Sequence, residues 1–487
     1  MIYKTYISKS NTIVNGSELN TSLSPVSALI YGRKDKYSRF LFYFDHSHVK
    51  ELYEDGTMPD MSKMTHTLHI TNAGSLDFTR VHDCGKEVMT DTEKYRAASF
   101  DLIFFLIPKP WDEGKGFDYQ YTFLNKDFYS HFNVDKERLI SKDACTWYNR
   151  RTFIPWDEEG VYSTDTLSVE YDKFSSGDTT SKVIGRLRFQ MGNEDVVLDV
   201  TDVMNKFITG ELENYGIGVA FTPLYELSDT RKENYLSLIT DKTNLWFAPY
   251  VETRYCDKVS DDRGRFTIGK KNKLYLYCTI GERLEDLDSN PTVTIKDTND
   301  EVVYENLEST KFSKGIYYIE LSVTGEVGDM FYDTWQNLYY QGMKLDDAEM
   351  DFVLQSPSNF FMLGNAIQED TTFSPSVSGI KEKEQIFRGD VRKLVITARP
   401  SYTTSKIQLI DSMDIRLYVK DGMAEIDCIS WDMVNKTSNE NFYVLDTSML
   451  IPNRYFVDVR IRYGMSSIVH HDVLTFDIVE DKTNKYA

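Results

Sequence analysis

Residues 315–323 read Gly-Ile-Tyr-Tyr-Ile-Glu-Leu-Ser-Val, and residues 454–461 read Arg-Tyr-Phe-Val-Asp-Val-Arg-Ile. From Tyr317 and from Tyr455 onward every second residue is apolar, which is typical of a strand with one buried face. Each segment is the third member of a round that consists of a strand, a strand–turn–strand, a Tyr-bearing strand and a closing strand. The two rounds cover 274–280, 293–302, 315–323 and 350–354, and then 393–397, 415–426, 454–461 and 474–478.

This repetition predicts two related β-sandwich modules in series, over residues 256–357 and 386–487. We expect both modules to be Ig-like and to superpose, with Tyr317 and Tyr455 opening equivalent strands. Sandwich modules of this kind indicate a structural or binding role for the second half of the chain. We do not expect catalytic chemistry there.

Residues 358–385 read as a linker between these modules. Pro375, Gly379 and several serines discourage regular structure. The run Phe360-Phe-Met-Leu363 is nevertheless too apolar for a free tether, since exposed apolar runs promote aggregation. We therefore expect a linker that is extended and docked on the chain or on a neighbour.

Residues 1–255 read as one large β domain. The chain has 32 Tyr and 28 Phe, and both residue types favour pleated, half-buried surfaces. The runs 39–45 and 102–107 have strand length and are read as core strands. Long inserts at about 50–66 and 109–160 interrupt the domain. Because the second insert carries three Trp residues, we expect it to fold over the sandwich.

The acidic composition restricts the partners. The net charge of −21 argues against nucleic-acid binding, because phosphate contacts require Lys and Arg. It argues equally against an anionic membrane surface. The charge can serve solubility alone, or it can belong to an acidic face that meets a basic partner subunit.

The cysteines and the hydropathy pattern exclude further classes. Five cysteines without a CxxC or Cys/His cluster predict neither a disulfide framework nor a zinc site. The first ten residues lack the apolar region of a secretory signal, and no apolar run reaches the roughly 18 residues of a membrane span. We expect reduced, buried thiols at Cys84, Cys145, Cys256, Cys278 and Cys428.

An ordered set of short motifs in residues 1–255 resembles a known family. The set is Arg39…Phe44-Asp45, then 199–207 (Asp-Val-Thr-Asp-Val-Met-Asn-Lys-Phe), then 214–217 (Asn-Tyr-Gly-Ile), then 241–244 (Asp-Lys-Thr-Asn) with Pro249-Tyr250. In this order the motifs resemble the DNRLRE domain, which is a jelly-roll β-sandwich similar to the propeptide fold of transforming growth factors. Two departures are Val251, where the family favours Leu, and the insert 109–160, which has no counterpart.

The resemblance implies an all-β fold with an N-terminal jelly-roll β-sandwich followed by two Ig-like β-sandwiches. The family occurs in bacterial surface proteins and in phage virion proteins. With two appended sandwiches, the chain resembles a virion protein of crAss-like phages, in which such chains are built into the collar and tail around the portal. This implies a structural ring or collar subunit that joins the portal–tail assembly or anchors tail fibres there. The subunit would be located in the virion and made in the bacterial host cytoplasm.

No motif in the sequence marks an enzyme. GxSxG, Walker A, HExxH and GxGxxG patterns are missing from it, so we expect neither catalytic residues nor a cofactor. His46 and His48 could share a metal if they lay on a strand, but we interpret them as part of an exposed polar loop and expect no metal. His66 and His69 should face opposite sides of a strand, and 470–471 should be a solvated turn.

Clusters of acidic residues have structural interpretations as well. Asp195, Asp199 and Asp202 lie near a predicted helix start, where Thr201 or Asp202 could cap the helix. A structural Ca²⁺ is the alternative for this cluster. A second group, near a predicted hairpin, has ordinary turn chemistry: Asp286, Asp288, Asp297 and Asp300.

The aromatic residues of the inserts and loops are our candidate interface residues, because Trp and Tyr are favoured anchors. The expected partners are other virion proteins (the portal and neighbouring ring or tail proteins) and further copies of this chain in a cyclic ring. The alternative function is a carbohydrate-binding or adhesion protein that uses the jelly roll, with exposed Trp residues stacking on sugars. The candidates are Trp111, Trp147, Trp156, Phe331, Tyr332, Trp335, Tyr339, Tyr340, Phe360 and Phe361.

Overall fold

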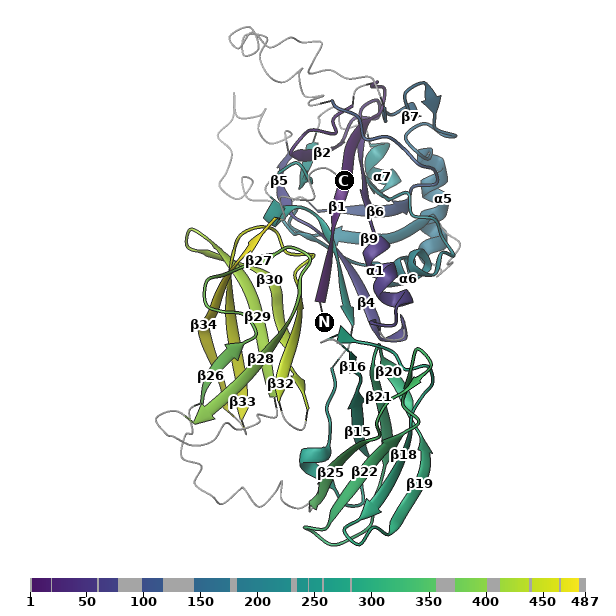
Figure 1. Cartoon of the computed structure of the whole chain (residues 1–487). Coiled ribbons are helices and arrows are strands. Elements are labelled where there is room, and N and C mark those ends of the chain that lie inside the picture. Colours follow the sequence, from purple (N-terminus) through teal and green to yellow (C-terminus); the bar gives the residue numbers. More distant parts are fainter. Residues whose placement is uncertain are drawn as a thin grey trace. The chain divides into compact units, whose positions relative to one another are not determined.

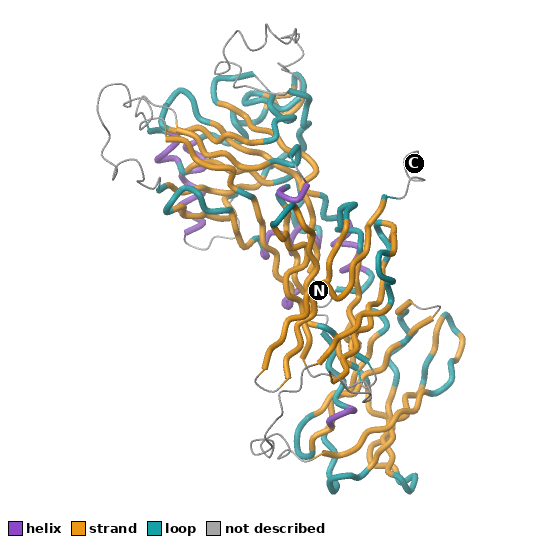
Figure 2. Tube along the Cα trace, turned by 90° about the vertical axis from the view of Figure 1, so that its left-hand side faces the viewer, coloured by secondary structure: helices purple, strands orange, loops and turns teal. Residues whose placement is uncertain are grey.

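Strands dominate the chain, as Figure 2 shows. The computed structural model describes residues 2–18, 20–58, 61–77, 99–116, 144–175, 182–228, 234–243, 245–255, 258–280, 283–355, 373–400, 412–437, 440–463 and 466–480. These residues divide into two compact units. The N-terminal unit contains residues 3–50 and 64–254, and the C-terminal unit contains residues 1–2, 51–63 and 255–487.

The N-terminal unit is a β-sandwich of jelly-roll type (Figure 1), which agrees with the predicted fold class. One sheet has the order β10-β4-β13-β1-β3-β11-β6-β9, and a second has the order β2-β12-β5. The strands are β1 (Ile2–Val14), β2 (Val26–Tyr31), β3 (Ser38–Phe44), β4 (Met64–Ile70), β5 (Asn72–Asp77), β6 (Phe100–Leu106), β9 (Val183–Phe189), β10 (Val196–Asp199), β11 (Ile217–Phe221), β12 (Asn234–Ile239) and β13 (Tyr250–Tyr255).

The central strands of this sandwich are buried on both faces. On β3, Phe40, Phe42 and Phe44 enter the core between the sheets, while Leu41 enters a second core on the other face. Strands β6 and β11 alternate in the same way, as the period of two requires. The second core is covered by part of the insert and by the helix α5, so the expectation that the insert folds over the sandwich is confirmed for its described residues.

Short helices and turns interrupt the strands of residues 2–255. They are α1 (Ser47–Glu54), α5 (Thr164–Ser175), α6 (Thr201–Thr209) and α7 (Pro223–Glu226), with 3₁₀ turns η1 (Met61–Lys63) and η4 (Leu245–Phe247) and a small hairpin of β7 (Asn149–Arg151) and β8 (Ile154–Pro155). Helix α1 corrects the expectation of a loop after residue 45. No helix among the described residues is long and apolar enough to span a bilayer.

The first C-terminal sandwich packs a five-stranded sheet, β14-β25-β22-β18-β19, against a three-stranded sheet, β15-β21-β20. Its strands, with the turn η5 (Arg263–Arg265) and two small hairpins, are β14 (Phe266–Thr267), β15 (Asn272–Tyr277), β16 (Thr279–Ile280), β17 (Arg283–Leu284), β18 (Thr292–Asp297), β19 (Val302–Glu308), β20 (Thr310–Ser313), β21 (Ile316–Leu321), β22 (Met330–Gln336), β23 (Tyr339–Tyr340), β24 (Met343–Lys344) and β25 (Ala348–Gln355).

The second C-terminal sandwich repeats this strand order. Its sheets are β27-β34-β33-β29-β30 and β26-β28-β32-β31. In both sandwiches a short edge strand pairs in parallel with the last strand, β14 with β25 and β27 with β34. The strands are β26 (Phe373–Ser378), β27 (Glu384–Phe387), β28 (Val391–Pro400), β29 (Ser412–Asp421), β30 (Ala424–Met433), β31 (Asn435–Lys436), β32 (Asn441–Asp446), β33 (Arg454–Tyr463) and β34 (Ser466–Val479).

Three of the four predicted correspondences between the modules agree with this order, and the Tyr strand does not. Tyr317 lies on β21 in the smaller sheet, whereas Tyr455 lies on β33 in the larger sheet. The strand equivalent to β33 is β22, and the strand equivalent to β21 is β32. Both strands alternate and carry a buried Tyr as their second residue, so the period alone could not tell which sheet each one joins.

The second sandwich begins earlier than residue 386. Residues 373–378 form β26 and pair with β28, so this part of the expected linker is extended, as predicted, but is a strand of the sandwich. The remainder of the linker, with Phe360 and Phe361, lies outside the described residues.

The hydroxyl of Tyr455 fixes the chain before β33. It accepts a hydrogen bond from the Ile451 N–H at 2.9 Å and donates one to the Ile451 carbonyl at 2.7 Å, and both groups are buried. The Tyr455→Phe variant would leave both backbone groups unpaired. We expect this to lower the free energy of unfolding by roughly 1–3 kcal/mol.

Urea denaturation of the full chain measures this loss, when unfolding is monitored by a probe in the second C-terminal sandwich. The control is Tyr339→Phe, since Tyr339 is 37% exposed and its hydroxyl can bond to water. Equal stability of the two variants would contradict the assigned role of the Tyr455 hydroxyl.

Candidate functional site

Five of the ten candidate interface aromatics lie in the chain's own cores. Trp111 and Trp147 are 2% exposed and Trp156 is 6% exposed, and all three pack on the outer face of the β3-β11-β6 sheet. Phe331 and Trp335 fill the core of the first C-terminal sandwich. This corrects the premise of the interface prediction for these five residues, because their side chains are covered by this chain and offer no surface to a partner.

The other candidates differ in their exposure. Tyr339 is 37% exposed, and it forms the small hairpin β23–β24 with the half-buried Tyr340. Tyr332 is also half-buried, on β22. Phe360 and Phe361 lie outside the described residues. These tyrosines stay candidates for a contact with a partner.

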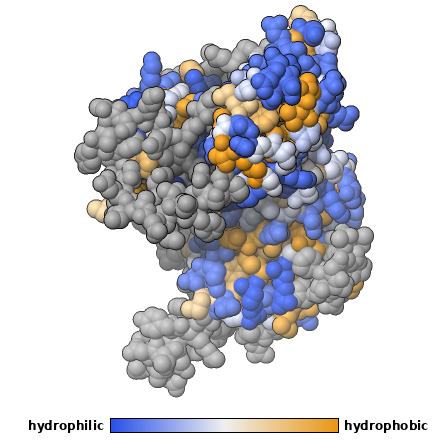
Figure 3. All heavy atoms as spheres, turned by 90° about the horizontal axis from the view of Figure 1, so that it is seen from below, coloured by the Kyte–Doolittle hydropathy of each residue, from blue (hydrophilic) through white to orange (hydrophobic). Residues whose placement is uncertain are grey.

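The insert exposes a different set of apolar residues, which sequence reasoning did not single out. On the face shown in Figure 3, hydrophobic and hydrophilic residues are interspersed over the coloured parts. The tip of the β7–β8 hairpin is distinct because Phe153, Ile154 and Pro155 are exposed consecutively, with Phe153 at 91%. The only sequence signal was the run Phe-Ile-Pro beside two Arg residues, which also fits a buried strand.

The most buried charge in the N-terminal unit is the guanidinium of Arg39. It forms a bidentate pair with the carboxylate of Glu226 on α7, at 2.8 Å and 2.7 Å, and both side chains are at most 1% exposed. Its Nη1 group donates to the carbonyl oxygens of Gly160 and Tyr162, and its Cζ atom lies 5.1 Å from the centroid of the Trp147 ring. Arg39 therefore joins β3, the end of the insert and α7.

The first C-terminal sandwich has a related centre at Arg263. The guanidinium pairs with Asp261 and with Asp333, which also accepts a hydrogen bond of 2.7 Å from the Trp335 indole N–H. Two carboxylates and one guanidinium leave an excess negative charge in a buried site. Burial raises the pKa of Asp261 to about 6, because a desolvated carboxylate is unfavourable in its charged form.

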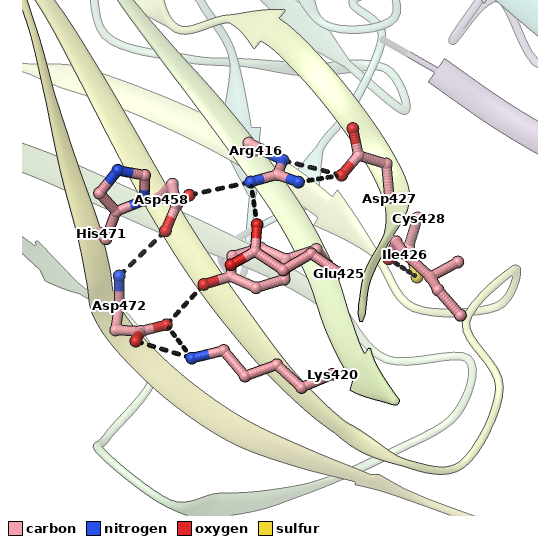
Figure 4. A network of polar contacts seen from close by, with 10 residues as sticks. Arg416, Lys420, Glu425, Ile426, Asp427, Cys428, Asp458, His471 and Asp472 are labelled. Atoms are coloured by element: carbon pink, nitrogen blue, oxygen red, sulfur yellow. Dashed lines mark hydrogen bonds and ion pairs between the residues drawn. The ribbon is translucent and has the colours of Figure 1, made fainter. Parts of the chain in front are cut away.

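A third polar centre joins β29, β30, β33 and β34 in the second C-terminal sandwich (Figure 4). Arg416 binds Glu425, Asp427 and the fully buried Asp458. Asp458 also accepts hydrogen bonds from the His471 ring at 2.9 Å and from the Asp472 N–H at 2.9 Å. This set is a network of cross-strand ion pairs.

His471 lies inside the long strand β34, so the expected turn at 470–471 is wrong. The register of β33 against β34 shifts between Val457 and Val459, and Asp472 has φ of 53°. A bulged strand can carry such a residue without ending the pairing.

The histidines at 46 and 48 have structural contacts. The His46 ring lies 3.1 Å from the Asn214 side-chain nitrogen and 3.2 Å from the Phe207 carbonyl oxygen, so both ring nitrogens are engaged. His48 is on α1 and packs against Tyr3. Among the described residues, no group of three or more His, Cys, Asp or Glu side chains is placed to hold a metal ion.

The motif residues around α6 also serve the scaffold. The N-cap residue of α6 is Val200, which has no side-chain cap, so the predicted capping by Thr201 or Asp202 is wrong. Thr201 instead accepts a hydrogen bond from the His66 N–H at 2.9 Å, and Asp199 accepts one from the Thr201 N–H. Asp195 accepts the Asn72 N–H in the same way.

The acidic group near the hairpin of the first sandwich follows ordinary turn chemistry, as expected. Asp297 accepts the N–H groups of Asn299 and Glu301. Asp286 and Asp288 bind backbone N–H groups of neighbouring loops. These carboxylates order loops of the sandwich.

The described cysteines are free thiols at 145, 278 and 428. Burial raises the pKa of Cys145 to about 12 and that of Cys278 to about 11. Protonated thiols are poor nucleophiles and poor metal ligands. Cys84 and Cys256 lie outside the described residues.

Comparisons with known proteins return Ig-like and fibronectin-like domains. A tandem pair of titin Ig domains is 12% identical and matches 44% of this chain and 92% of that chain, with a TM-score of 0.16. Fibronectin(III)-like modules of CbhA from Clostridium thermocellum are 10% identical, with coverages of 48% and 95% and a TM-score of 0.15. No protein-family model matches the chain, and no curated protein matches it significantly. At such TM-scores the likeness carries no argument.

Removing the Arg39 side chain should destabilise the N-terminal unit. Arg39→Met leaves Glu226 as a buried charge without its partner, which typically costs about 3–5 kcal/mol. Chemical denaturation of the full chain, followed by Trp fluorescence, measures this loss. The control is Arg33→Met, since the ion pair of Arg33 with Asp35 is exposed and such pairs contribute at most about 1 kcal/mol.

The double variant Arg39→Met with Glu226→Met completes the experiment. It should recover part of the stability, because an apolar pair of similar volume no longer buries a charge. A loss in Arg39→Met no larger than that in Arg33→Met would contradict the role of this pair.

Acid should weaken the N-terminal unit through His66. The ring is fully buried against the Thr253 hydroxyl at 2.8 Å, and burial lowers the pKa of His66 from 6.5 to about 4. Below pH 6.5 the unfolded chain gains a proton at His66 that the folded chain does not bind. The free energy of unfolding should therefore fall as the pH falls from 6.5 to 4, by up to about 1.4 kcal/mol per pH unit.

The variant His66→Asn should flatten this pH dependence, measured as denaturation midpoints of the N-terminal unit between pH 7 and pH 4. Replacement of the exposed His471 by Asn should leave the slope for this unit unchanged. A wild-type slope that persists in His66→Asn would show that other groups control acid stability.

Proposed function

We propose that the chain is a non-enzymatic structural subunit of a multi-protein assembly, specifically a ring or collar protein that joins the portal and tail of a phage virion. The structural part of the proposal is supported by the buried charges. The virion part is supported by the resemblance of residues 1–255 to DNRLRE domains and by the two appended sandwiches.

The observation that carries the proposal is the pairing of buried carboxylates with arginine. Each of the buried Asp and Glu residues in the described ranges forms an ion pair with an Arg of the same sandwich. A catalytic carboxylate needs a free oxygen that faces a substrate, whereas paired carboxylates fix the strands that carry them. These residues are Asp101, Glu226, Glu252, Asp261, Asp333, Asp414 and Asp458.

The partners of such a subunit follow from its surface. With a net charge of −21, copies of the chain repel one another at long range, so assembly needs apolar contacts or basic surfaces on partners. In a cyclic ring each copy uses one surface to reach its neighbour and another to receive it. The partners proposed are the portal, neighbouring ring or tail proteins and further copies of this chain.

Labelling of particles tests the virion location. Antibodies raised to the purified chain should bind the collar region of phage particles purified from the bacterial culture that produces the chain, as seen by negative-stain electron microscopy. Antibody depleted on the purified chain is the control.

The opposite result would be a chain that never sediments with particles. If that chain also bound a defined glycan on an array, with its melting temperature raised by the same glycan, the carbohydrate-binding alternative would replace the virion function.

A further inference from the structure

The tip of the β7–β8 hairpin carries an apolar side chain that is exposed and has a strained backbone. Phe153 is 91% exposed and has φ of 60°. A bulky residue in this left-handed region is a rare outlier that costs about 1–3 kcal/mol, and Gly would adopt the same backbone without strain. Neither the backbone nor the burial of Phe153 therefore accounts for a phenylalanine at this position.

Hydrogen bonds at its base hold the hairpin in one conformation. The Trp156 N–H donates to the Tyr148 carbonyl at 3.0 Å, and its indole N–H donates to the Thr146 carbonyl at 3.1 Å. The Thr152 hydroxyl accepts the Ala144 N–H at 2.9 Å. A contact that is already ordered loses little conformational entropy when it binds. The tryptophans of the insert thus hold the hairpin in place, and the Phe153 side chain is exposed at its tip.

Two arginines and one carboxylate lie at the base of the hairpin. Arg150 donates to the Pro110 carbonyl at 2.8 Å, and Arg151 pairs at 3.3 Å with Asp112, in an exposed geometry. An apolar tip beside two guanidinium groups is complementary to an apolar groove with an acidic rim.

The second C-terminal sandwich has such a groove, where β33 begins and β34 ends. Its volume is about 460 Å³, which exceeds that of a phenylalanine side chain. Pro452 and Val479 supply partly exposed apolar surface above the buried Ile478, and Asp477 and Glu480 are the acidic groups that line it. The remaining lining residues are polar: Gln385, Asn453 and Arg454. Asp477 is partly neutralised by Arg454 at 2.8 Å, whereas Glu480 is exposed.

We propose that Phe153 of one copy of this chain inserts into the groove at residues 452–480 of a second copy, with Arg151 facing Glu480. We place this contact in a heterologous arrangement, in which it repeats from copy to copy and closes a ring or extends a filament. The inference rests on the proposed structural function, for which it supplies the contact between neighbouring copies.

Self-association of the purified full chain tests the proposal. Analytical ultracentrifugation should show concentration-dependent oligomers, and Phe153→Gly should weaken this association at least 10-fold. Phe153→Gly should also melt at or above the wild-type temperature, since Gly relieves the strained φ. The matched control is Met423→Ser, because Met423 is a fully exposed apolar residue elsewhere and its loss should leave association unchanged.

A charge exchange tests the docking partner within the groove. Arg151→Glu and Glu480→Lys should each weaken association, and the two together should restore it. Glu301→Lys, on an acid outside the groove, should have no comparable effect. Failure of the double exchange to restore association, or a wild-type chain that stays monomeric at all concentrations, would overturn the proposal.

Photo-crosslinking identifies the site directly. A benzophenone amino acid at position 153 should crosslink to residues 452–480, and a mixture of ¹⁴N- and ¹⁵N-labelled chains should yield mixed-label products. A crosslink within one chain, or to another surface, would refute the assignment, as would Phe153-dependent sedimentation with phosphatidylserine vesicles in place of self-association. These results do not depend on where the chain is found in particles, so failure of the virion location would be recognised separately.

Discussion

The N-terminal unit depends on one buried ion pair. Arg39 lies on the central strand β3, on the face that points away from the core between the sheets, and there its guanidinium has no access to water. A charge in that position requires a carboxylate and further acceptors. Glu226 supplies the carboxylate, and the carbonyl groups of Gly160 and Tyr162 supply the acceptors. The insert and α7 must therefore fold onto this face of the sheet.

This constraint explains where the aromatic residues of the insert lie. Once the chain is held at residues 160–162, Trp147 and Trp156 cover the Arg39 face and form its apolar surroundings. The same packing leaves the hairpin between these two tryptophans pointing outward. The two C-terminal sandwiches follow a similar rule, since Arg263 and Arg416 each join strands through carboxylates that would otherwise be buried without a counter-ion.

The sequence predicted the positions of the strands better than it predicted which strands pair with one another. Alternation of apolar residues locates β15, β21 and β33 correctly, because a period of two is a local property. The sheet that each strand joins depends on long-range pairing, and for this reason Tyr317 and Tyr455 were wrongly matched. The same limit applies to the Trp residues, because composition shows that a loop is rich in aromatics but not which of them the chain covers. The exposure of Phe153 likewise depends on how the whole insert packs on the sheet, which no local pattern encodes.

The most direct measurement of this account is amide hydrogen exchange of the full chain, followed by mass spectrometry, for the wild type and Arg39→Met. If Arg39 holds the insert on the sheet, amides of residues 144–163 should exchange at least 10-fold faster in the variant, while those of β6 and β11 stay protected. This pattern corresponds to local opening of one part of the unit. Unchanged protection of residues 144–163 in a folded Arg39→Met chain would contradict the claim that this pair organises the insert and presents its hairpin.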